Sequence, residues 1–429
     1  MFAGVFLVWH HVYAAEIITA LLNAMAGAWL YLAGRMFAGR RAAAIAAILL
    51  GFAPFFVGVF PDGAGFVINH GGHSLLADAP ALSLIVLSFW LLLRALARQT
   101  SVRFGVAGFA LAMSVLMRFG SLSSVGVLGL LVLAADRRVR AISSCAVGFL
   151  LGFGPYLCWS RWRYGGFFET LKLGWANFDG PRESPFFYLR LYGDIFTWIS
   201  LAGIALWFAQ WLGELMKKHS EAPPSDLAGA RYSGRMQAFL WLWLVVVLVF
   251  FSSLRHSEPR YIMPVAPPLF LLAGIGLSVL LKGRRPLTRW GGAALLTAGM
   301  IYTLAPLRQR MRGDLIDRSV SEEMTVSEFL NQEVPPGAVL YTNMNYPDFG
   351  YYTSLPIEPL PESGAELYKE LGTLSSGDLL IAYKTLDDGT AAEPSISWID
   401  SNPRFQRFKE FPSLIVYKYH APPVSGPEK

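Results

Sequence analysis

The residue best suited to chemistry in this sequence is Asp78, which stands within an apolar run. It follows Leu75–Ala77 and precedes Ala79–Leu82. A charged side chain in a segment of this kind is costly and is usually retained for function. A carboxylate at this position could orient or deprotonate a hydroxyl group, or bind a metal ion. The alternative is a structural acid at a helix start, where the helix dipole favours a negative charge.

The segment before this carboxylate carries further polar side chains, namely Asp62, His70 and His73. The spacing of the two histidines is compatible with a pair of metal ligands, but no third ligand is evident. A solvated pair in a loop is the better explanation for them. We therefore predict no metal site, retain His73 as a candidate substrate contact and expect no cofactor, leaving a requirement for a divalent metal open.

Arginines at the ends of apolar segments are the second kind of candidate, because a guanidinium can hold a phosphate through paired hydrogen bonds. The alternative is that they anchor the segments at a membrane surface, together with neighbouring aromatic residues. Arg260 and the adjacent Tyr261 open one apolar run, and Arg118 joins two short apolar runs. Arg161 and Arg163 lie in the basic and aromatic stretch RWRYGGFF. The predicted phosphate or substrate contacts are Arg260, Tyr261, Arg118, Arg161 and Arg163.

The composition indicates which elements position these residues. The chain of 429 residues is 54% hydrophobic and 15% charged, whereas a soluble domain has about 25% charged residues. A transmembrane helix needs about 20 apolar residues, and the chain contains stretches that reach or approach this length. We predict a polytopic α-helical membrane protein with about ten transmembrane segments: 14–33, 42–60, 75–93, 104–117, 121–135, 141–160, 195–212, 237–254, 261–281 and 290–307.

The charges between these segments predict their orientation, because cytoplasmic loops are enriched in Lys and Arg. The first segment is followed by Arg35, Arg40 and Arg41, so it should run inward, and the later segments alternate consistently. Asp78, Arg118 and Arg260 would then all lie at the outer face. The exception is 161–194, an outer loop with several basic residues, which phosphate binding would explain. The expected location is the inner or plasma membrane of the cell.

The charge balance changes near residue 312. Residues 1–311 hold 27 Lys and Arg against 12 Asp and Glu, whereas residues 312–429 hold 9 against 18. Strand and helix patterns alternate in the second part, which favours a small α/β domain. We predict two domains, a membrane domain over 1–311 and a soluble extracytoplasmic α/β domain over 312–429. The predicted elements are helices 319–333 and 365–374 and strands 338–342, 379–383 and 413–419.

Two binding functions find no support in the sequence. The second domain has no glycine-rich phosphate loop, so nothing indicates nucleotide binding there. No face of interleaved basic and aromatic residues of the type that binds nucleic acid stands out, and we expect no nucleic-acid partner. The basic charge of the first domain is better explained by membrane topology and phosphate contact.

Several of these segments, taken in order, resemble the bacterial glycosyltransferases of the GT-C superfamily. The resemblance is to the group that contains the protein mannosyltransferase, aminoarabinose transferase and Rgt-like enzymes. It covers roughly residues 14–307, and each motif falls on the same predicted outer side or on the basic turn that follows the first segment. The matching stretches are LLNAMAGAWLYLAGRMFAGR at Leu22–Arg41, LADAP at Leu76–Pro80, YGGF at Tyr164–Phe167 and RYIMPVAP at Arg260–Pro267.

The resemblance implies inverting transfer of a sugar from a polyprenyl-phosphate donor to a lipid, glycan or protein acceptor outside the cytoplasm. Asp78 would participate as the carboxylate of the site and the arginines would hold the phosphate. The family's first outer loop carries the acidic residue taken to be the general base, and this sequence has no such loop. We therefore expect the chain to begin at what is normally a later helix, through a late start codon or a truncation.

Two other functions stay open on the sequence alone. A transporter or lipid flippase would place polar groups near the bilayer midplane and contain internal repeats with broken helices. The ionisable residues of this chain lie instead at segment ends, and no repeat is evident. A truncated, non-catalytic membrane protein is the other alternative, because the loop with the general base has no counterpart.

Overall fold

The structure is a computed structural model of the 429-residue chain. The chain divides into two compact units, Met1–Met311 and Arg312–Lys429, which are described separately. The described residues are 12–53, 78–135, 139–176, 184, 186–190, 192–218, 227–255, 259–282, 290–294, 296–299, 301, 322–343, 349–350, 352–361, 365–384 and 392–420.

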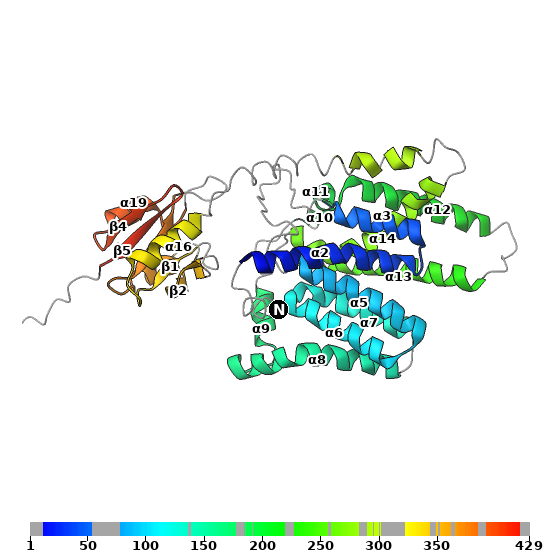
Figure 1. The fold of residues 1–429 in the computed structure, drawn as a ribbon, viewed down its shortest axis with the longest axis horizontal. Helices are drawn as coiled ribbons and strands as arrows, with labels where there is room; N and C mark the ends of the chain where they lie inside the picture. The colour runs from blue at the N-terminus through cyan, green and yellow to red at the C-terminus, as the bar shows by residue number, and fades with distance from the viewer. Residues whose placement is uncertain are drawn as a thin grey trace, which may run out of the picture. The chain divides into compact units, whose positions relative to one another are not determined.

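The first unit is built of helices, labelled in Figure 1. Its long apolar sequences form α-helices because a backbone in an apolar environment must satisfy its own hydrogen bonds. The helices are α2 (Val12–Arg35), α3 (Arg40–Gly51), α5 (Asp78–Arg98), α6 (Ser101–Met117), α7 (Leu122–Ala135), α8 (Val139–Tyr164), α9 (Glu169–Ala176), α10 (Phe187–Arg190), α11 (Tyr192–Phe196), α12 (Trp198–Lys218), α13 (Leu227–Ser252) and α14 (Ala266–Lys282), with 3₁₀ turns η2 (Phe119–Ser121) and η3 (Pro259–Val265).

The apolar helical character predicted from the sequence is confirmed in this unit. Among the described residues, four helical stretches are long and apolar enough to cross a membrane. The number of ten spans stays a prediction, since segments 42–60 and 290–307 fall partly outside the described residues. The four stretches are Pro80–Arg98, Val139–Tyr164, Gly234–Ser252 and Tyr261–Leu281.

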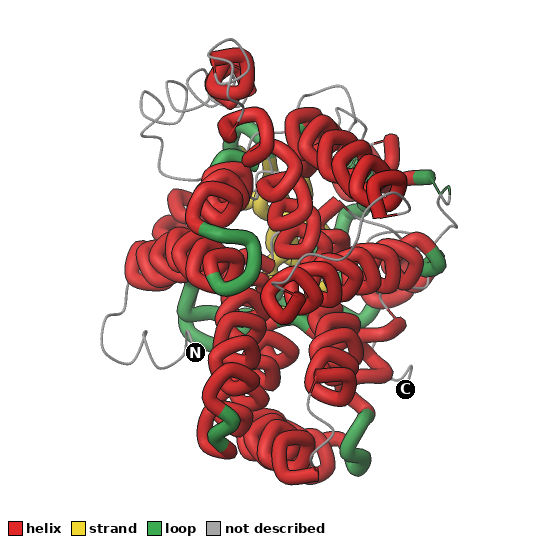
Figure 2. Tube along the Cα trace, turned by 90° about the vertical axis from the view of Figure 1, so that its right-hand side faces the viewer, coloured by secondary structure: helices red, strands yellow, loops and turns green. Residues whose placement is uncertain are grey.

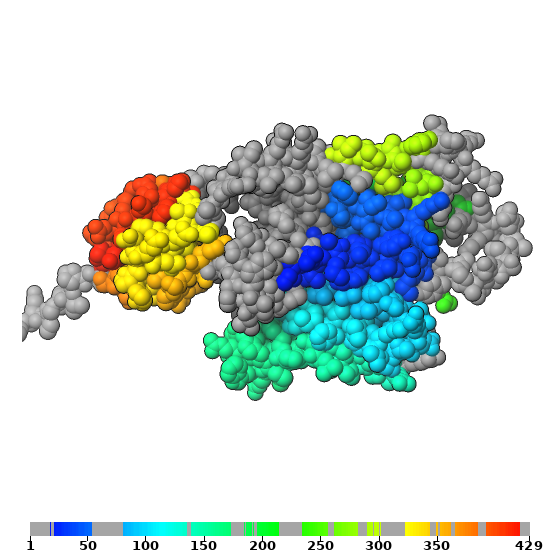
Figure 3. All heavy atoms as spheres, in the orientation of Figure 1, coloured from blue at the N-terminus to red at the C-terminus, as the bar shows by residue number. Residues whose placement is uncertain are grey.

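Neighbouring helices pack in a continuous row, α8–α6–α5–α2–α3–α14–α12. Helices α7 and α13 contact each other, and α13 also contacts α14. Figure 2 shows many of these helices nearly end-on, and in Figure 3 the surface of α2 borders that of α5. The large buried rings of Phe89 on α5 and Trp243 on α13 meet edge to face, with centroids 5.3 Å apart, so α5 and α13 share one apolar core.

Helix α8 corrects one prediction. The stretch from residue 161 was expected to be an outer loop, but the helix continues to Tyr164. No glycine or proline occurs between Arg161 and Tyr164, and the helix ends at Gly165, whose positive φ of 80° and backbone hydrogen bond to Arg161 are typical of a glycine at a helix end. Arg161 and Arg163 therefore belong to the last turn of α8, and α9 occupies part of the predicted loop.

Helices α6 and α8 approach each other unusually closely, because both place glycine at the contact. A Cβ atom added to Gly148 would lie 1.9 Å from the carbonyl oxygen of Gly105, and one added to Gly108 would lie 2.0 Å from that of Cys145. Real Cβ atoms do not reach such distances. Small residues at this contact are therefore required for the backbone-to-backbone packing, as is common between membrane helices.

Replacing one of these glycines tests this packing. Gly148→Ala should lower the free energy of unfolding by about 1–3 kcal/mol, the usual cost of overpacking. Gly129→Ala on α7 is the matched control, because a Cβ there meets nothing within 4 Å. The measurement is thermal unfolding of the purified chain in detergent. Equal melting temperatures for the two variants would show that the close contact is absent.

The second unit contains a five-stranded mixed sheet in the order β2-β1-β3-β5-β4. Strands β2, β1 and β3 pair in parallel, whereas β5 is antiparallel to both β3 and β4. The strands are β1 (Leu340–Thr342), β2 (Ile357–Pro359), β3 (Leu379–Tyr383), β4 (Phe405–Glu410) and β5 (Leu414–Tyr419), and the helices are α16 (Glu322–Glu333), α18 (Ala365–Leu371) and α19 (Ile396–Ser401).

Helices cover both faces of this sheet. Val326 and Leu330 of α16 pack with alternate residues of β3 and β5 on one face, and Leu367 of α18 and Ile399 of α19 pack on the other. Every residue of β3 is buried, as expected for a central strand between two helical layers. The second unit is therefore a three-layer α/β structure.

An ion-pair network links α19 to the antiparallel edge of the sheet. Asp400 accepts a hydrogen bond of 2.9 Å from Nε of Arg407, and the hydroxyl of Tyr417 donates another of 2.9 Å. The Arg407 hydrogen bond holds the pKa of Asp400 below its ordinary value of 3.8. The stabilisation from this carboxylate is complete above that ordinary value, and it is lost as the pH falls through the lowered pKa.

Removing this carboxylate should loosen the edge of the sheet. Asp400→Ala leaves the Tyr417 hydroxyl without its acceptor, at a cost of about 1–3 kcal/mol. Amide hydrogen exchange of the full chain at pH 7 should then increase in β4, β5 and α19. Glu358→Ala on β2, where the side chain is exposed, is the control and should leave exchange unchanged. Equal exchange in the two variants would contradict a stabilising role for the network.

Candidate functional site

Three segments predicted to carry chemistry meet around one small hollow in the first unit. The first turns of α5, the junction between α6 and α7, and η3 each contribute to its wall. The residues that line it are Ala81, Leu82, Ile85, Arg118, Gly120, Ser121, Tyr261, Met263 and Pro264. Segments far apart in the sequence thus converge where helices begin or break.

The break between α6 and α7 positions Arg118. This residue has an extended backbone, with φ −155° and ψ 121°, while its N–H still bonds to the carbonyl of Ser114. Its own carbonyl accepts from the N–H of Ser121, the last residue of the 3₁₀ turn η2. A Cβ at Gly120 would be in ordinary van der Waals contact with the Phe251 ring, at 3.4 Å. The arginine is therefore held at the interruption of a helix.

The 3₁₀ turn η3 positions Tyr261 opposite this arginine. Pro264 lies inside η3, and because proline has no N–H it is unsuited to the interior of an α-helix. The Tyr261 side chain is buried, and the guanidinium carbon of Arg118 lies 4.9 Å from its ring centroid. This distance is that of a cation–π interaction, worth about 0.5–2 kcal/mol. The predicted candidates Arg118 and Tyr261 are therefore in contact.

The two strongest candidates from the sequence border this hollow along the chain. Asp78 is the first residue of α5 and precedes Ala81, Leu82 and Ile85 by three, four and seven positions, a spacing that places them on one helix face. Arg260 directly precedes Tyr261 in η3. The side chains of Asp78 and Arg260 lie outside the described part of the structure. Their meeting in one pocket therefore stays a prediction.

The remaining candidates lie elsewhere. Arg161 and Arg163 are exposed in the last turn of α8 and do not line the hollow. The Arg161 guanidinium donates to the carbonyl of Gly165 and lies 6.0 Å from the ring centroid of Phe167. His73 falls outside the described residues, as do His70 and Asp62. Among the described residues, no three His, Cys, Asp or Glu side chains gather in a way that could hold a metal ion.

A series of aromatic rings runs between the arginine junction and the end of α8. Phe119, next to Arg118, lies 5.8 Å from Tyr156 between ring centroids. Tyr156 lies 5.7 Å from Trp159, which in turn lies 5.5 Å from Tyr164. The rings of Trp159 and Tyr164 are partly exposed. Packed aromatic side chains thus connect the basic and aromatic end of α8 with Phe119, the neighbour of Arg118 in the sequence.

Two buried serines near the hollow were not singled out from the sequence. Ser121 lines the hollow and is 1% exposed. Ser124, one turn further along α7, is fully buried, and its hydroxyl has no hydrogen-bond partner among the described residues. The only available signal was the polar cluster GSLSS between two apolar runs. Serine is common in membrane helices, so this signal is weak.

Comparison with known proteins identifies the class of this fold. The profile of the Alg9-like mannosyltransferase family matches residues 188–323. The crystal structure of ArnT from Cupriavidus metallidurans bound to undecaprenyl phosphate is similar with a TM-score of 0.64 at 16% identity, covering 96% of this chain and 85% of that one. The oligosaccharyltransferase of Archaeoglobus fulgidus is similar with a TM-score of 0.53 at 13% identity, covering 86% and 57%. The predicted resemblance to the GT-C glycosyltransferases is confirmed.

Within this class, the sequence is similar to aminoarabinose transferases. The undecaprenyl phosphate-alpha-4-amino-4-deoxy-L-arabinose arabinosyl transferase of Pseudomonas aeruginosa is 31% identical over 218 residues, which is 39% of this chain and 38% of that protein. A transferase of the same description from Pseudomonas fluorescens is 40% identical over 156 residues, or 35% and 24%. The alignments therefore span well under half of each relative. The apolar helices and these membrane-protein relatives indicate that the chain is an integral membrane protein.

Proposed function

We propose that this protein is a membrane glycosyltransferase that moves a sugar from a polyprenyl-phosphate donor to an acceptor outside the cytoplasm. The observation that carries the proposal is the convergence of the start of α5, Arg118 and η3 on one hollow. The similarity to aminoarabinose transferases, which are named for undecaprenyl phosphate, supports the donor class. The acceptor is a lipid, a glycan or a protein, and the sugar is left unspecified.

The proposed reaction breaks the bond between the anomeric carbon and the phosphate oxygen of the donor. An acceptor hydroxyl attacks the same carbon from the opposite side, so the configuration inverts. The hydroxyl proton passes to a carboxylate, and the electron pair of the broken bond remains on the polyprenyl phosphate. This leaving group needs its developing charge stabilised, and a fixed cation in a dry site is well suited to this task.

The candidate residues in the hollow, and those elsewhere in the first unit, are assigned to these steps as follows. Asp78 orients or deprotonates the acceptor hydroxyl, and Arg260 and Arg118 stabilise the phosphate. Tyr261 is a positioning residue, because its buried ring packs against the Arg118 guanidinium. Arg161, Arg163 and His73 are assigned to donor contacts further from the reacting carbon. No step requires a cofactor, and the requirement for a divalent metal is left to experiment.

The proposed arrangement in the membrane follows from the charges. The start of α5, the α6–α7 junction and η3 would face the outside, together with the domain formed by residues 312–429. The basic ends of α5 and α8, with Arg98 in the last turn of α5 and Arg140 in the first turn of α8, would then face the cytoplasm. This orientation brings the hollow to the leaflet from which an extracytoplasmic acceptor is reached.

The assignment predicts large losses of activity from two single substitutions. Arg260→Gln should lower kcat by about 10²–10³-fold, the usual effect of removing one electrostatic contact from a transition state. Asp78→Asn should lower it by about 10²–10⁴-fold, as expected for loss of a carboxylate that takes part in the proton transfer. The measurement is turnover of a radiolabelled polyprenyl-phosphate sugar by the purified chain in lipid nanodiscs, with transfer to the acceptor followed by chromatography.

Matched controls separate these roles from general damage. Arg235→Gln on α13 and Glu358→Gln on β2 change exposed charges that are not among the residues lining the hollow, and they should leave turnover unchanged. A double variant, Asp78→Ala with Arg260→Ala, that keeps wild-type turnover would refute the site assignment. Movement of the lipid-linked sugar across the bilayer without formation of a new glycosidic bond would instead identify a flippase.

A further inference from the structure

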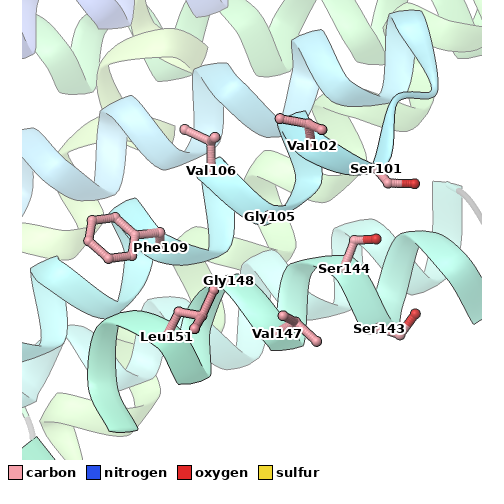
Figure 4. A pocket seen from close by; sticks show the side chains of 10 residues that line it. All are labelled: Ser101, Val102, Gly105, Val106, Phe109, Ser143, Ser144, Val147, Gly148 and Leu151. Carbon is pink, nitrogen blue, oxygen red and sulfur yellow. The ribbon is translucent and has the colours of Figure 1, made fainter. Parts of the chain in front are cut away.

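An open groove runs between α6 and α8 on the surface of the first unit, apart from the hollow. Its volume is about 530 Å³, within the range of about 300–1,000 Å³ that is typical of ligand sites. Figure 4 shows three serines at one end of the groove and Phe109 and Leu151 at the other. None of its lining residues also lines the hollow.

The groove exists because glycines bring the two helices together. Gly105 and Gly148 lie where the backbones touch, so its floor consists of backbone without side chains. The walls are formed by exposed apolar side chains, including Val102, Val106 and Val147, which are 77%, 49% and 55% exposed. An apolar channel of this kind on a membrane helix pair suits a flexible hydrocarbon chain.

One end of the groove is polar and basic. Ser101 of α6 and Ser143 and Ser144 of α8 line this end. Arg140 is exposed and precedes Ser144, Val147 and Leu151 by four, seven and eleven positions, which places it on the same face of α8 as the groove lining. The first turns of both helices contain no acidic residue. The charge at this end is therefore complementary to an anion.

The length of the groove fits one leaflet of a membrane. Eleven residues of α-helix from Arg140 to Leu151 span about 16 Å, and half of the hydrocarbon core of a bilayer is about 15 Å. Both helices start at the basic end, because Gly105 contacts Gly148 and Ala112 contacts Gly152 further along. An anionic group at Arg140 would thus be at the level of lipid headgroups while its chain lies in the groove.

We infer that this groove binds an anionic phospholipid, with its phosphate at Arg140 and the serine hydroxyls and one acyl chain between α6 and α8. A second copy of the chain is the competing occupant. A symmetric parallel contact through this face would bring Arg140 against its own counterpart, and such like charges oppose association. The charge pattern therefore favours the lipid. The inference rests on the membrane location of the helices and not on sugar transfer.

Selective stabilisation by lipid tests the inference. The purified, delipidated full-length chain in a neutral detergent is titrated with phosphatidylglycerol or with phosphatidylcholine of the same acyl chains. Phosphatidylglycerol should raise the melting temperature in a saturable manner, and phosphatidylcholine should do so much less. Arg140→Gln should remove the difference between the two lipids, whereas Arg235→Gln on α13 should preserve it.

A second pair of variants tests the place of the acyl chain. Val147→Trp fills the groove, whereas Val249→Trp on α13 adds the same bulk at a site that is similarly exposed, at 60% against 55%. Native mass spectrometry should show several-fold less bound phosphatidylglycerol with Val147→Trp and no change with Val249→Trp. Equal lipid binding by the two variants would overturn the proposal, as would a dimer that only Val147→Trp abolishes.

A measurement on the unmodified chain guards against misfolded variants. Phosphatidylglycerol with a photoreactive group on its acyl chain should label peptides of α6 and α8 between residues 102 and 151. Competition by excess unlabelled phosphatidylglycerol should suppress this labelling. Labelling spread evenly over the exposed apolar helices, α13 included, would also overturn the proposal, because it would show only general solvation by lipid.

Discussion

The structure depends on the requirement that backbone polar groups in an apolar environment find partners within the protein. Continuous helices meet this requirement, so they carry almost no ionisable residues in their interiors. Charged side chains are tolerated at positions where a helix begins, ends or is interrupted. Arg118 sits at such a break between α6 and α7, and Tyr261 lies in the 3₁₀ turn that precedes α14. The hollow forms because two interruptions and one helix start coincide in space.

This constraint explains how much of the site was accessible from the sequence. Charged residues next to long apolar runs are conspicuous, so Asp78, Arg118 and Arg260 could be selected from their positions alone. The contact between Arg118 and Tyr261 could not be derived, because it depends on how α5, α6 and α13 pack. The buried residues Ser121 and Ser124 were not predicted as part of the site, because serine is common in membrane helices and gives only a weak signal there. Sequence thus located the charged residues but not their apolar and weakly polar surroundings.

The fold was predictable to a similar extent. Hydrophobic length identified the helices, and the central strands β3 and β5 were recognised within a residue or two because they are almost entirely apolar. Strand β4 was missed because its sequence FQRFKE is mostly exposed and charged, as expected of an edge strand. The end of α8 was placed too early because Arg161 and Arg163 were weighed as loop residues. The charged residues of these two segments indicate that the segments are exposed to solvent. They do not indicate whether the backbone there forms a strand, a helix or a loop.

Helix α6 connects the two surfaces that carry the proposals. It spans 17 residues, or about 26 Å, with the groove at its start and Arg118 just after its end. Charges at the two sites are therefore separated by about the length of α6, and because Coulomb energy falls with distance, direct electrostatic coupling between them is weaker than between neighbouring charges. The remaining route is mechanical, because the contact of Gly105 and Gly108 with α8 fixes the tilt of α6 between the two sites. Because the two backbones are in direct contact, α6 can slide little along α8. This contact therefore holds in place the end of α6 where Arg118 meets Tyr261.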